Sequence, residues 1–249
     1  MSETSAFEAL NSDAQSRVLV LCDHASNRVP DDINNGTLGI SDADMARHIA
    51  YDIGARGTAL EMSKALNAPM LASCFSRLVI DPNRGEDDPT ILMKIYDHTI
   101  VEGNRYADAT EKRLRIEAYH RPYHAAIDKA LASITDKGHQ PIILSVHSYT
   151  PQLNGRPERP WHIGILWDKD GRIAEPLIEK LSENPEICVG NNEPYSGELR
   201  GDTMYYHATR NGYAHVLIEL RHDLIDTDEG QEKWAAILAA PLKDIIANL

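Results

Sequence analysis

The sequence predicts an α/β fold in which a mostly parallel or mixed sheet is covered by helices on both faces. Short runs of almost entirely apolar residues recur along the 249-residue chain and alternate with segments of helical periodicity. Strands that are apolar on both sides are typical of a sheet buried between two layers of helices. The chain contains no repeat, low-complexity tract or linker. We therefore expect one domain over residues 1–249, with residues 1–16 as a flexible N-terminal arm.

The expected elements follow from the periodicity of the apolar residues. A spacing of four between Met45, Ile49 and Ile53 indicates a helix that Ser41 would cap. Pro122 has no amide hydrogen to continue a helix, so we expect a new helix to begin there. The apolar runs predict strands at 17–22, 69–74, 78–80, 142–146, 162–167 and 215–220. The helical patterns cover residues 41–53, 107–135, 174–182 and 229–248.

Composition excludes several classes of function. The formal net charge is −13, from 25 basic and 38 acidic side chains, which argues against nucleic acid or anionic lipid as a partner. A small anionic substrate remains compatible, because one arginine in a dry pocket outweighs a distant field. Cys22, Cys74 and Cys188 are isolated, so neither a disulfide framework nor a thiolate zinc site is expected. No signal peptide or membrane-spanning run is evident, and we expect a cytoplasmic protein.

Polar side chains with catalytic potential follow four of the predicted strands. These segments are Asp23–His24, Asp81–Arg84, His147–Ser148 and Glu219–His222. In open α/β sheets, ligands bind outside the carboxyl ends of the strands. We therefore expect these segments to converge on one site.

His24 and His147 are the candidate metal ligands. A single histidine after a strand is usually a structural residue, but two at the ends of separate core strands favour a metal site. Neutral imidazole is a common ligand of zinc, and catalytic zinc has three protein ligands and one open position. The sequence thus predicts a site for one zinc ion.

Glu219 and Arg84 each have two interpretations. A carboxylate at the end of an apolar strand either forms a salt bridge, with Arg221 or a helix, or serves as a general base. A guanidinium after a strand either closes the turn with Asp81 or grips a substrate carboxylate in bidentate fashion.

His120 and His124 have the i, i+4 spacing of helical zinc ligands. Pro122 lies between them, and Arg121 stands where helical zinc proteases have glutamate. Hydrogen bonding near the site is therefore favoured over metal binding for these two residues.

Four segments together resemble the N-formylglutamate amidohydrolase family, in the order in which the family has them. The segments are Cys22–Pro30, Ser76–Arg84, Arg121–His124 and Asn192–Gly197. The resemblance runs from about residue 18 to residue 225. It implies hydrolysis of N-formyl-L-glutamate to formate and L-glutamate, at the end of a histidine-degradation route.

A wider resemblance links the chain to the zinc carboxypeptidases. It rests on the segments Ser145–Gln152, Asp81–Arg84 and Ile218–Arg221. It implies zinc on His24 and His147, and Glu219 as the general base. It also implies that Asn83 and Arg84 hold the carboxylate of a small N-acyl amino acid. Arg77 is a candidate, from its position alone, for stabilising the oxyanion or a second carboxylate.

The first ligand motif departs from the carboxypeptidase pattern. That pattern is His-x-x-Glu, whereas here His24 is followed three residues later by Asn27. An amide oxygen is a poorer zinc ligand than a carboxylate. Asn27 is the expected third ligand, with Asp52, Asp23 or water as alternatives. Two other functions stay open: a deacylase or carboxypeptidase-like hydrolase of another N-acyl amino acid, and a catalytically silent carboxylate-binding protein.

Overall fold

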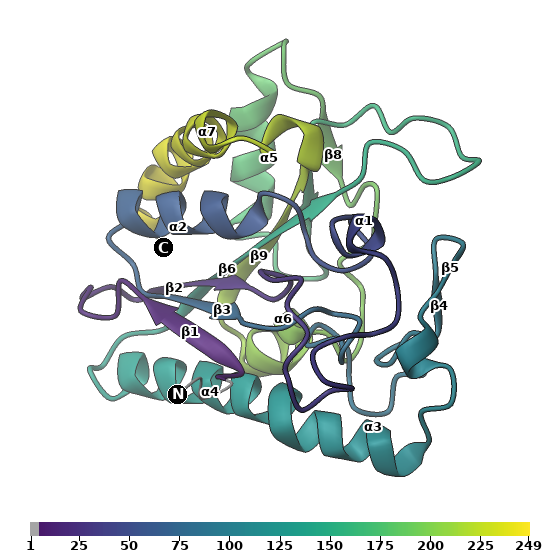
Figure 1. The fold of residues 1–249 in the computed structure, drawn as a ribbon. Helices are drawn as coiled ribbons and strands as arrows, with labels where there is room; N and C mark the ends of the chain where they lie inside the picture. The colour runs from purple at the N-terminus through teal and green to yellow at the C-terminus, as the bar shows by residue number, and fades with distance from the viewer. Residues whose placement is uncertain (1–4) are drawn as a thin grey trace.

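A seven-stranded mixed sheet forms the centre of the computed structural model, which describes residues 5–249 (Figure 1). The strand order is β1-β3-β2-β6-β9-β7-β8. Strands β3, β2, β6 and β9 run parallel, while β1 and β7 are antiparallel to their neighbours β3 and β9. The strands are β1 (Phe7–Leu10), β2 (Val18–Cys22), β3 (Met70–Ser73), β6 (Ile142–Tyr149), β7 (Ile163–Leu166), β8 (Val189–Asn191) and β9 (Ala214–Arg221).

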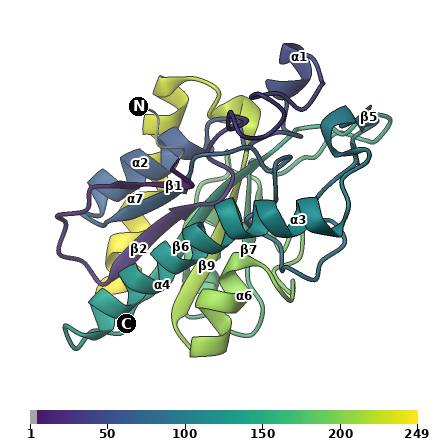
Figure 2. The same cartoon turned by 60° about the horizontal axis from the view of Figure 1, so that its bottom comes forward.

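Helices cover both faces of this sheet. One layer consists of α2 (Ala55–Ala65), α5 (Ala174–Ser182) and α7 (Asp228–Ala247). The opposite layer consists of α4 (Arg121–Thr135) and α6 (Thr203–His207). Figure 2 shows α3 (Ala109–Arg115) extending the line of α4 beyond the sheet. The predicted α/β class and the predicted mixed sheet are confirmed.

Strand β2 shows why its sequence is continuously apolar. Val18, Val20 and Cys22 pack on the α2–α7 side, whereas Leu19 and Leu21 pack on the α4 side. Successive side chains of a strand point to opposite faces, so a strand between two helical layers needs an apolar residue at every position.

The remaining elements lie outside the two main layers. They are α1 (Asp42–Met45), the hairpin β4 (Ile95–Tyr96) with β5 (Thr99–Ile100), and a π-helical turn, Ile116–His120. Short 3-10 turns occur at Glu102–Asn104, Thr209–Asn211 and His222–Leu224. In residues 5–249, no helix is long and apolar enough to cross a membrane.

The strand predicted at residues 78–80 is wrong. Leu78, Val79 and Ile80 are fully buried, but they form a turn in which the Val79 amide donates to the Ser76 carbonyl. They pack beneath the loops, against Phe75 among others. An apolar run reports burial, and a buried turn meets that condition as well as a strand does.

The helix predicted at 41–53 begins correctly and ends early. The Ser41 hydroxyl accepts a hydrogen bond from the Asp44 amide, yet α1 stops at Met45. The chain then runs irregularly to Gly54, which has a φ of 76° and lies against the Ile225 carbonyl. A Cβ there would lie 1.9 Å from that oxygen, so only glycine fits. This irregular segment brings Asp52 to the edge of the sheet, and α2, which follows, was not predicted.

The expected N-terminal arm is wrong for Phe7–Leu10, which form an edge strand paired antiparallel with β3. Phe7 and Leu10 are partly buried against the core, which stabilises the pairing. Residues 1–4 of that arm lie outside the described part of the chain.

Candidate metal centre and active site

The strand-end side chains converge at one edge of the sheet, as predicted. His24 follows β2, His147 lies on β6 and Glu219 lies on β9, and these three strands are neighbours. Together with Arg84 they line a cavity of about 310 Å³. The remaining lining includes Tyr96, Tyr149, Tyr195, Leu166, Leu199 and Leu217. The cavity therefore combines a polar floor with aromatic and aliphatic walls.

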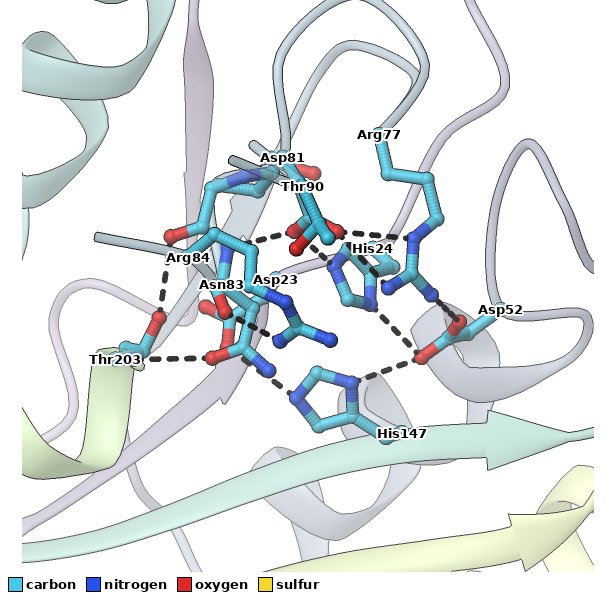
Figure 3. Close-up of polar contacts among 12 residues, drawn as sticks. Asp23, His24, Asp52, Arg77, Asp81, Asn83, Arg84, Thr90, His147 and Thr203 are labelled. Carbon is cyan, nitrogen blue, oxygen red and sulfur yellow. Dashed lines mark hydrogen bonds and ion pairs between the residues drawn. The ribbon is translucent and has the colours of Figure 1, made fainter. Parts of the chain in front are cut away.

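Three buried side chains form a group with the geometry of a metal site. One ligand atom from each of His24, Asp52 and His147 lies within 4.8 Å of the others. Asp52 Oδ2 is 3.2 Å from His24 Nδ1 and 2.8 Å from His147 Nδ1 (Figure 3). Two imidazoles and one carboxylate are a ligand set found in catalytic zinc sites.

Carboxylates also contact the other nitrogen of each ring. His24 Nε2 lies 2.7 Å from Asp81 Oδ1, and His147 Nε2 lies 3.2 Å from Asp23 Oδ2. Metal-binding histidines typically donate the second ring N–H to a carboxylate in this way. An Nε2–H that donates leaves the Nδ1 lone pair of a neutral ring facing Asp52. The lone pair and the carboxylate repel each other unless a cation, either a proton or a metal ion, lies between them.

The pKa of His147 reflects the carboxylates that surround its ring. Burial alone would lower that pKa, but hydrogen bonds to Asp23 and Asp52 outweigh burial and raise it well above its usual value. A metal ion on Nδ1 would take the place of the added proton toward Asp52, while Nε2–H still donates to Asp23.

Charge balance also favours a divalent cation. Asp23, Asp52 and Asp81 are buried around the two rings, and Arg77 is the guanidinium paired with two of them. With both rings neutral, three carboxylates against one paired guanidinium leave two negative charges, and uncompensated buried charge is costly. The residues present therefore fit a divalent metal ion such as zinc.

Asn27 does not take part in this group, contrary to expectation. Its side chain is exposed and donates to the Met45 carbonyl at 2.9 Å, and it does not line the cavity. The chain after His24 turns toward the surface without forming a helix or strand. Asp52 lies next to His24 instead, because its amide donates to the His24 carbonyl at 2.9 Å.

Arg77 lines the same cavity and is paired with two carboxylates of the metal group. Its Nη2 and Nε donate to Asp81 Oδ2 at 2.9 and 3.2 Å, and its Nη1 lies 3.3 Å from Asp52 Oδ1. These contacts fix the two carboxylates that face His24. The expected oxyanion role of Arg77 stays a prediction, whereas its contacts support a role in orienting Asp52 and Asp81.

Glu219 has the surroundings of a base. Burial, aided by the charge of Asp52 and opposed by His147, raises the pKa of Glu219 to about 7. Within residues 5–249, Glu219 Oε2 is buried and has no hydrogen-bond partner. The alternative salt bridge with Arg221 is absent from the described structure, because Arg221 pairs with Asp223 at 2.8 Å.

Arg84 and Asn83 lie side by side at the cavity wall (Figure 3). In the described chain, the one hydrogen bond of the Arg84 guanidinium goes to the Asn83 carbonyl, at 2.7 Å. Asp81 already binds Arg77 and His24, so the alternative turn-closing pair with Arg84 does not form. The Asn83 side-chain oxygen accepts from the Thr203 amide at 3.0 Å. Arg84 therefore retains donors for a carboxylate in the cavity.

The chain is similar to known proteins over most of its length. The model of the N-formylglutamate amidohydrolase family matches residues 16–226. An N-formylglutamate deformylase of Pseudomonas putida is 24% identical over 252 residues, covering 93% of this chain and 90% of that protein. The corresponding protein of Pseudomonas aeruginosa is 26% identical over 208 residues, covering 76% of each.

Two solved structures are similar over nearly the whole chain. A gene product of Agrobacterium tumefaciens is 32% identical, with a TM-score of 0.92, covering 99% of this chain and 96% of that one. An N-formylglutamate amidohydrolase of Ralstonia eutropha is 20% identical, with a TM-score of 0.69, covering 97% of each chain. The second likeness shows a shared fold.

Proposed function

Because the chain belongs to the N-formylglutamate amidohydrolase family, we propose that it hydrolyses N-formyl-L-glutamate to formate and L-glutamate. The names of the Pseudomonas relatives support this substrate. The observation that carries the proposal is the shared cavity, which joins a metal-binding group, a buried carboxylate and an arginine with spare donors. These three parts are sufficient for metal-assisted hydrolysis of an N-acyl amino acid.

We propose zinc as the metal, held by His24, Asp52 and His147. A zinc ion bound there would supply Lewis acidity for attack of water on the formyl carbon. Asp81 and Asp23 accept from the Nε2–H of the two rings, which leaves each Nδ1 lone pair available as a ligand. Arg77 orients Asp52 and Asp81 through its ion pairs with them.

Glu219 transfers a proton from the attacking water to the amide nitrogen. Its carboxylate accepts a proton from the attacking water as the new C–O bond forms at the formyl carbon. It then passes that proton to the amide nitrogen as the C–N bond breaks, which releases formate and the free amine. A raised pKa suits both steps, since a base near neutrality accepts and returns a proton readily.

Arg84, with Asn83, binds the α-carboxylate of the substrate. A guanidinium donates to both oxygens of a carboxylate in one plane, which fixes the orientation of the ligand as well as its charge. The small cavity, about 310 Å³, supports a single amino acid derivative rather than a long peptide as the ligand. Orientation by the clamp would bring the formyl carbon between the metal group and Glu219.

We further propose the cytoplasm as the location, which the free cysteines support, and histidine degradation as the route, which the family resemblance implies. Of the two rival functions, the silent carboxylate-binding protein is disfavoured by Asp52, which completes the ligand set that Asn27 does not supply. Hydrolysis of a different N-acyl amino acid uses the same residues and is decided by experiment.

A substrate panel tests the proposal. Purified protein would be incubated with N-formyl, N-acetyl and N-propionyl derivatives of L-glutamate, L-aspartate and L-glutamine, and free amine would be measured. We expect the highest kcat/KM with N-formyl-L-glutamate, and equal amounts of formate and L-glutamate. A higher value with another acyl group or amino acid would reassign the substrate, and no release from any derivative would refute the enzyme.

A further inference from the structure

Three histidines contact or support the turn that carries Asn83 and Arg84, the proposed substrate clamp. His124 Nε2 lies 2.9 Å from the Pro82 carbonyl, and His120 Nε2 lies 2.8 Å from the Arg84 carbonyl. The two carbonyls on either side of Asn83 thus each contact one histidine, and the Pro82 carbonyl also accepts from the Thr203 hydroxyl at 3.4 Å. His207 lies behind them, with its Nε2 at 2.7 Å from His124 Nδ1.

The helix geometry explains how both rings reach this turn. A π-helical turn, Ile116–His120, precedes α4, and Pro122 lies within the first turn of α4. His120 and His124 are one turn apart, and their rings lie with centroids 4.2 Å apart and planes tilted by 31°. Two adjacent donors on one helix face match two carbonyls separated by one residue. π-helical turns interrupt regular helices at a cost and frequently occur at functional sites.

The hydrogen-bond pattern fixes the tautomers. A carbonyl only accepts, so Nε2 of His120 and of His124 carries the hydrogen. The Nδ1 of His124 then accepts from the Nε2–H of His207. Burial lowers the pKa of His124 to about 3 and also lowers that of His120, which keeps both rings neutral. The outer nitrogen of His207, Nδ1, lies 3.0 Å from the 73% exposed side chain of Asp128, and this contact is a hydrogen bond when His207 carries both ring hydrogens.

The histidines do not contact the substrate cavity. They line a second cavity, of about 820 Å³, which shares no lining residue with the first. Their effect on catalysis would therefore pass through the backbone of residues 82–84. On the inner side, the same turn is tied to the metal group by the Asn83 amide, which donates to Asp81 Oδ1 at 2.9 Å.

We infer that His120 and His124, supported by His207, are positioning residues. They hold the Arg84 guanidinium and the Asn83 side-chain amide in the orientation that binds the substrate carboxylate. The inference rests on the proposed function, since it requires Arg84 to bind that carboxylate. Without the two donors, the carbonyls of Pro82 and Arg84 would lose these hydrogen bonds, and the turn would shift as they form others. Misplacement of a clamp by about 1 Å can cost as much as 10²-fold in rate.

Glutamine and asparagine substitutions separate positioning from general folding. Glutamine places its amide N–H₂ about where His Nε2 lies, whereas asparagine is one methylene too short to reach the carbonyl. We would prepare His124→Gln, His124→Asn, His120→Gln and His120→Asn. His215 is the matched control, because it is also buried and its Nδ1 contacts a carbonyl, that of Tyr213, at 2.8 Å. It does not line either cavity.

The readout is the kcat/KM for N-formyl-L-glutamate divided by the kcat/KM for its α-amide, measured on zinc-loaded protein. Zinc content and melting temperature are measured on the same samples. We expect the asparagine variants at 120 and 124 to lower this ratio by about 10–100-fold, mainly through KM, with zinc content unchanged. The glutamine variants should recover most of it. Both His215 variants should leave the ratio unchanged, even where they lower the melting temperature.

The outcomes distinguish this inference from the proposed function. If the wild-type ratio is near one, or if Arg84→Ala does not lower it, the clamp itself is wrong. If Arg84→Ala lowers the ratio while the asparagine variants at 120 and 124 keep the wild-type value, the positioning role is wrong and the clamp stands. Equal loss in the asparagine and glutamine variants would also overturn it, because the restored donor should matter.

Discussion

His147 and Glu219 lie directly opposite each other on the neighbouring parallel strands β6 and β9. Their pairing belongs to a register of eight residue pairs, from Ile142 with Ala214 to Tyr149 with Arg221. A shift of one residue would turn Glu219 to the other face of the sheet. The distance between the proposed metal ligand and the proposed base is therefore set by backbone pairing in the buried centre of the fold.

This pairing predicts that Glu219→Gln loses catalysis without losing structure. Glutamine keeps the shape of glutamate but cannot accept the proton, and a general base contributes about 10²–10⁴-fold to rate. We expect a fall in kcat of that size, with zinc content and melting temperature close to wild type. A variant that turns over at near wild-type rate would remove Glu219 from the mechanism, and a large loss of stability would indicate a structural role.

The pH dependence should report the same residue. Burial raises the pKa of Glu219 to about 7, and only the ionised form accepts a proton. The value of kcat/KM should therefore fall as the pH drops through about 7. A bound metal ion favours the carboxylate, which moves this acid limb to lower pH. Rates measured from pH 5 to 9 should show the limb in wild type, and a limb that persists in Glu219→Gln would assign it to another group.

Most of the candidate site can be predicted from the sequence because its residues lie at strand ends. His24, His147 and Glu219 each follow or end an apolar run, and parallel strands bring their carboxyl ends together. The same rule did not identify Asp52, which lies on an irregular connection between α1 and α2. Only the fold of residues 46–54, with Gly54 against the Ile225 carbonyl, brings it to His24.

Asn27 is a residue that a motif selects and that the fold does not bring to the site. It was selected by spacing after His24, as in carboxypeptidases, and its side chain is exposed and bound to the Met45 carbonyl. A motif spacing predicts a ligand only where the backbone between the two residues has the expected conformation. Long-range features such as the edge strand β1 and the contact of His124 with the Pro82 carbonyl depend on tertiary packing, which local patterns do not contain.

Asp52 and Asn27 should differ in their effect on metal binding. Removal of the carboxylate in Asp52→Asn should weaken zinc binding by more than about 100-fold, since even partners behind the ligands contribute 10–100-fold. Asn27→Ala and Asn27→Glu should bind zinc as the wild type does. Competition with a chromogenic chelator measures all three affinities. Tighter binding by Asn27→Glu would return Asn27 to the ligand set.

Metal removal should abolish activity reversibly. We expect about one zinc per chain, at about 2.0–2.1 Å from the ligand nitrogens, as is usual for histidine. Protein treated with a chelator should be inactive and should recover when zinc is added in equimolar amount. His147→Ala should lose both zinc and activity. Full activity in protein shown by mass spectrometry to be metal-free would refute the metal centre.

Arg84 should contribute to substrate binding and little to stability. Its guanidinium has one hydrogen bond in the described chain, to the Asn83 carbonyl, so Arg84→Ala loses few internal contacts. Loss of a charged hydrogen-bond pair with the substrate should raise KM by about 10–100-fold. Arg84→Lys should recover only part of this, because an ammonium group is a point charge and lacks the planar pair of donors.

The α-amide of N-formyl-L-glutamate tests the same contact from the side of the substrate. It lacks the carboxylate that Arg84 would bind, so the wild type should prefer the free acid by about the factor that Arg84→Ala loses. In Arg84→Ala the two substrates should be hydrolysed at similar kcat/KM. The double comparison isolates the contact, because each change alone removes the same interaction. If the wild type hydrolyses acid and amide equally well, Arg84 does not bind the α-carboxylate.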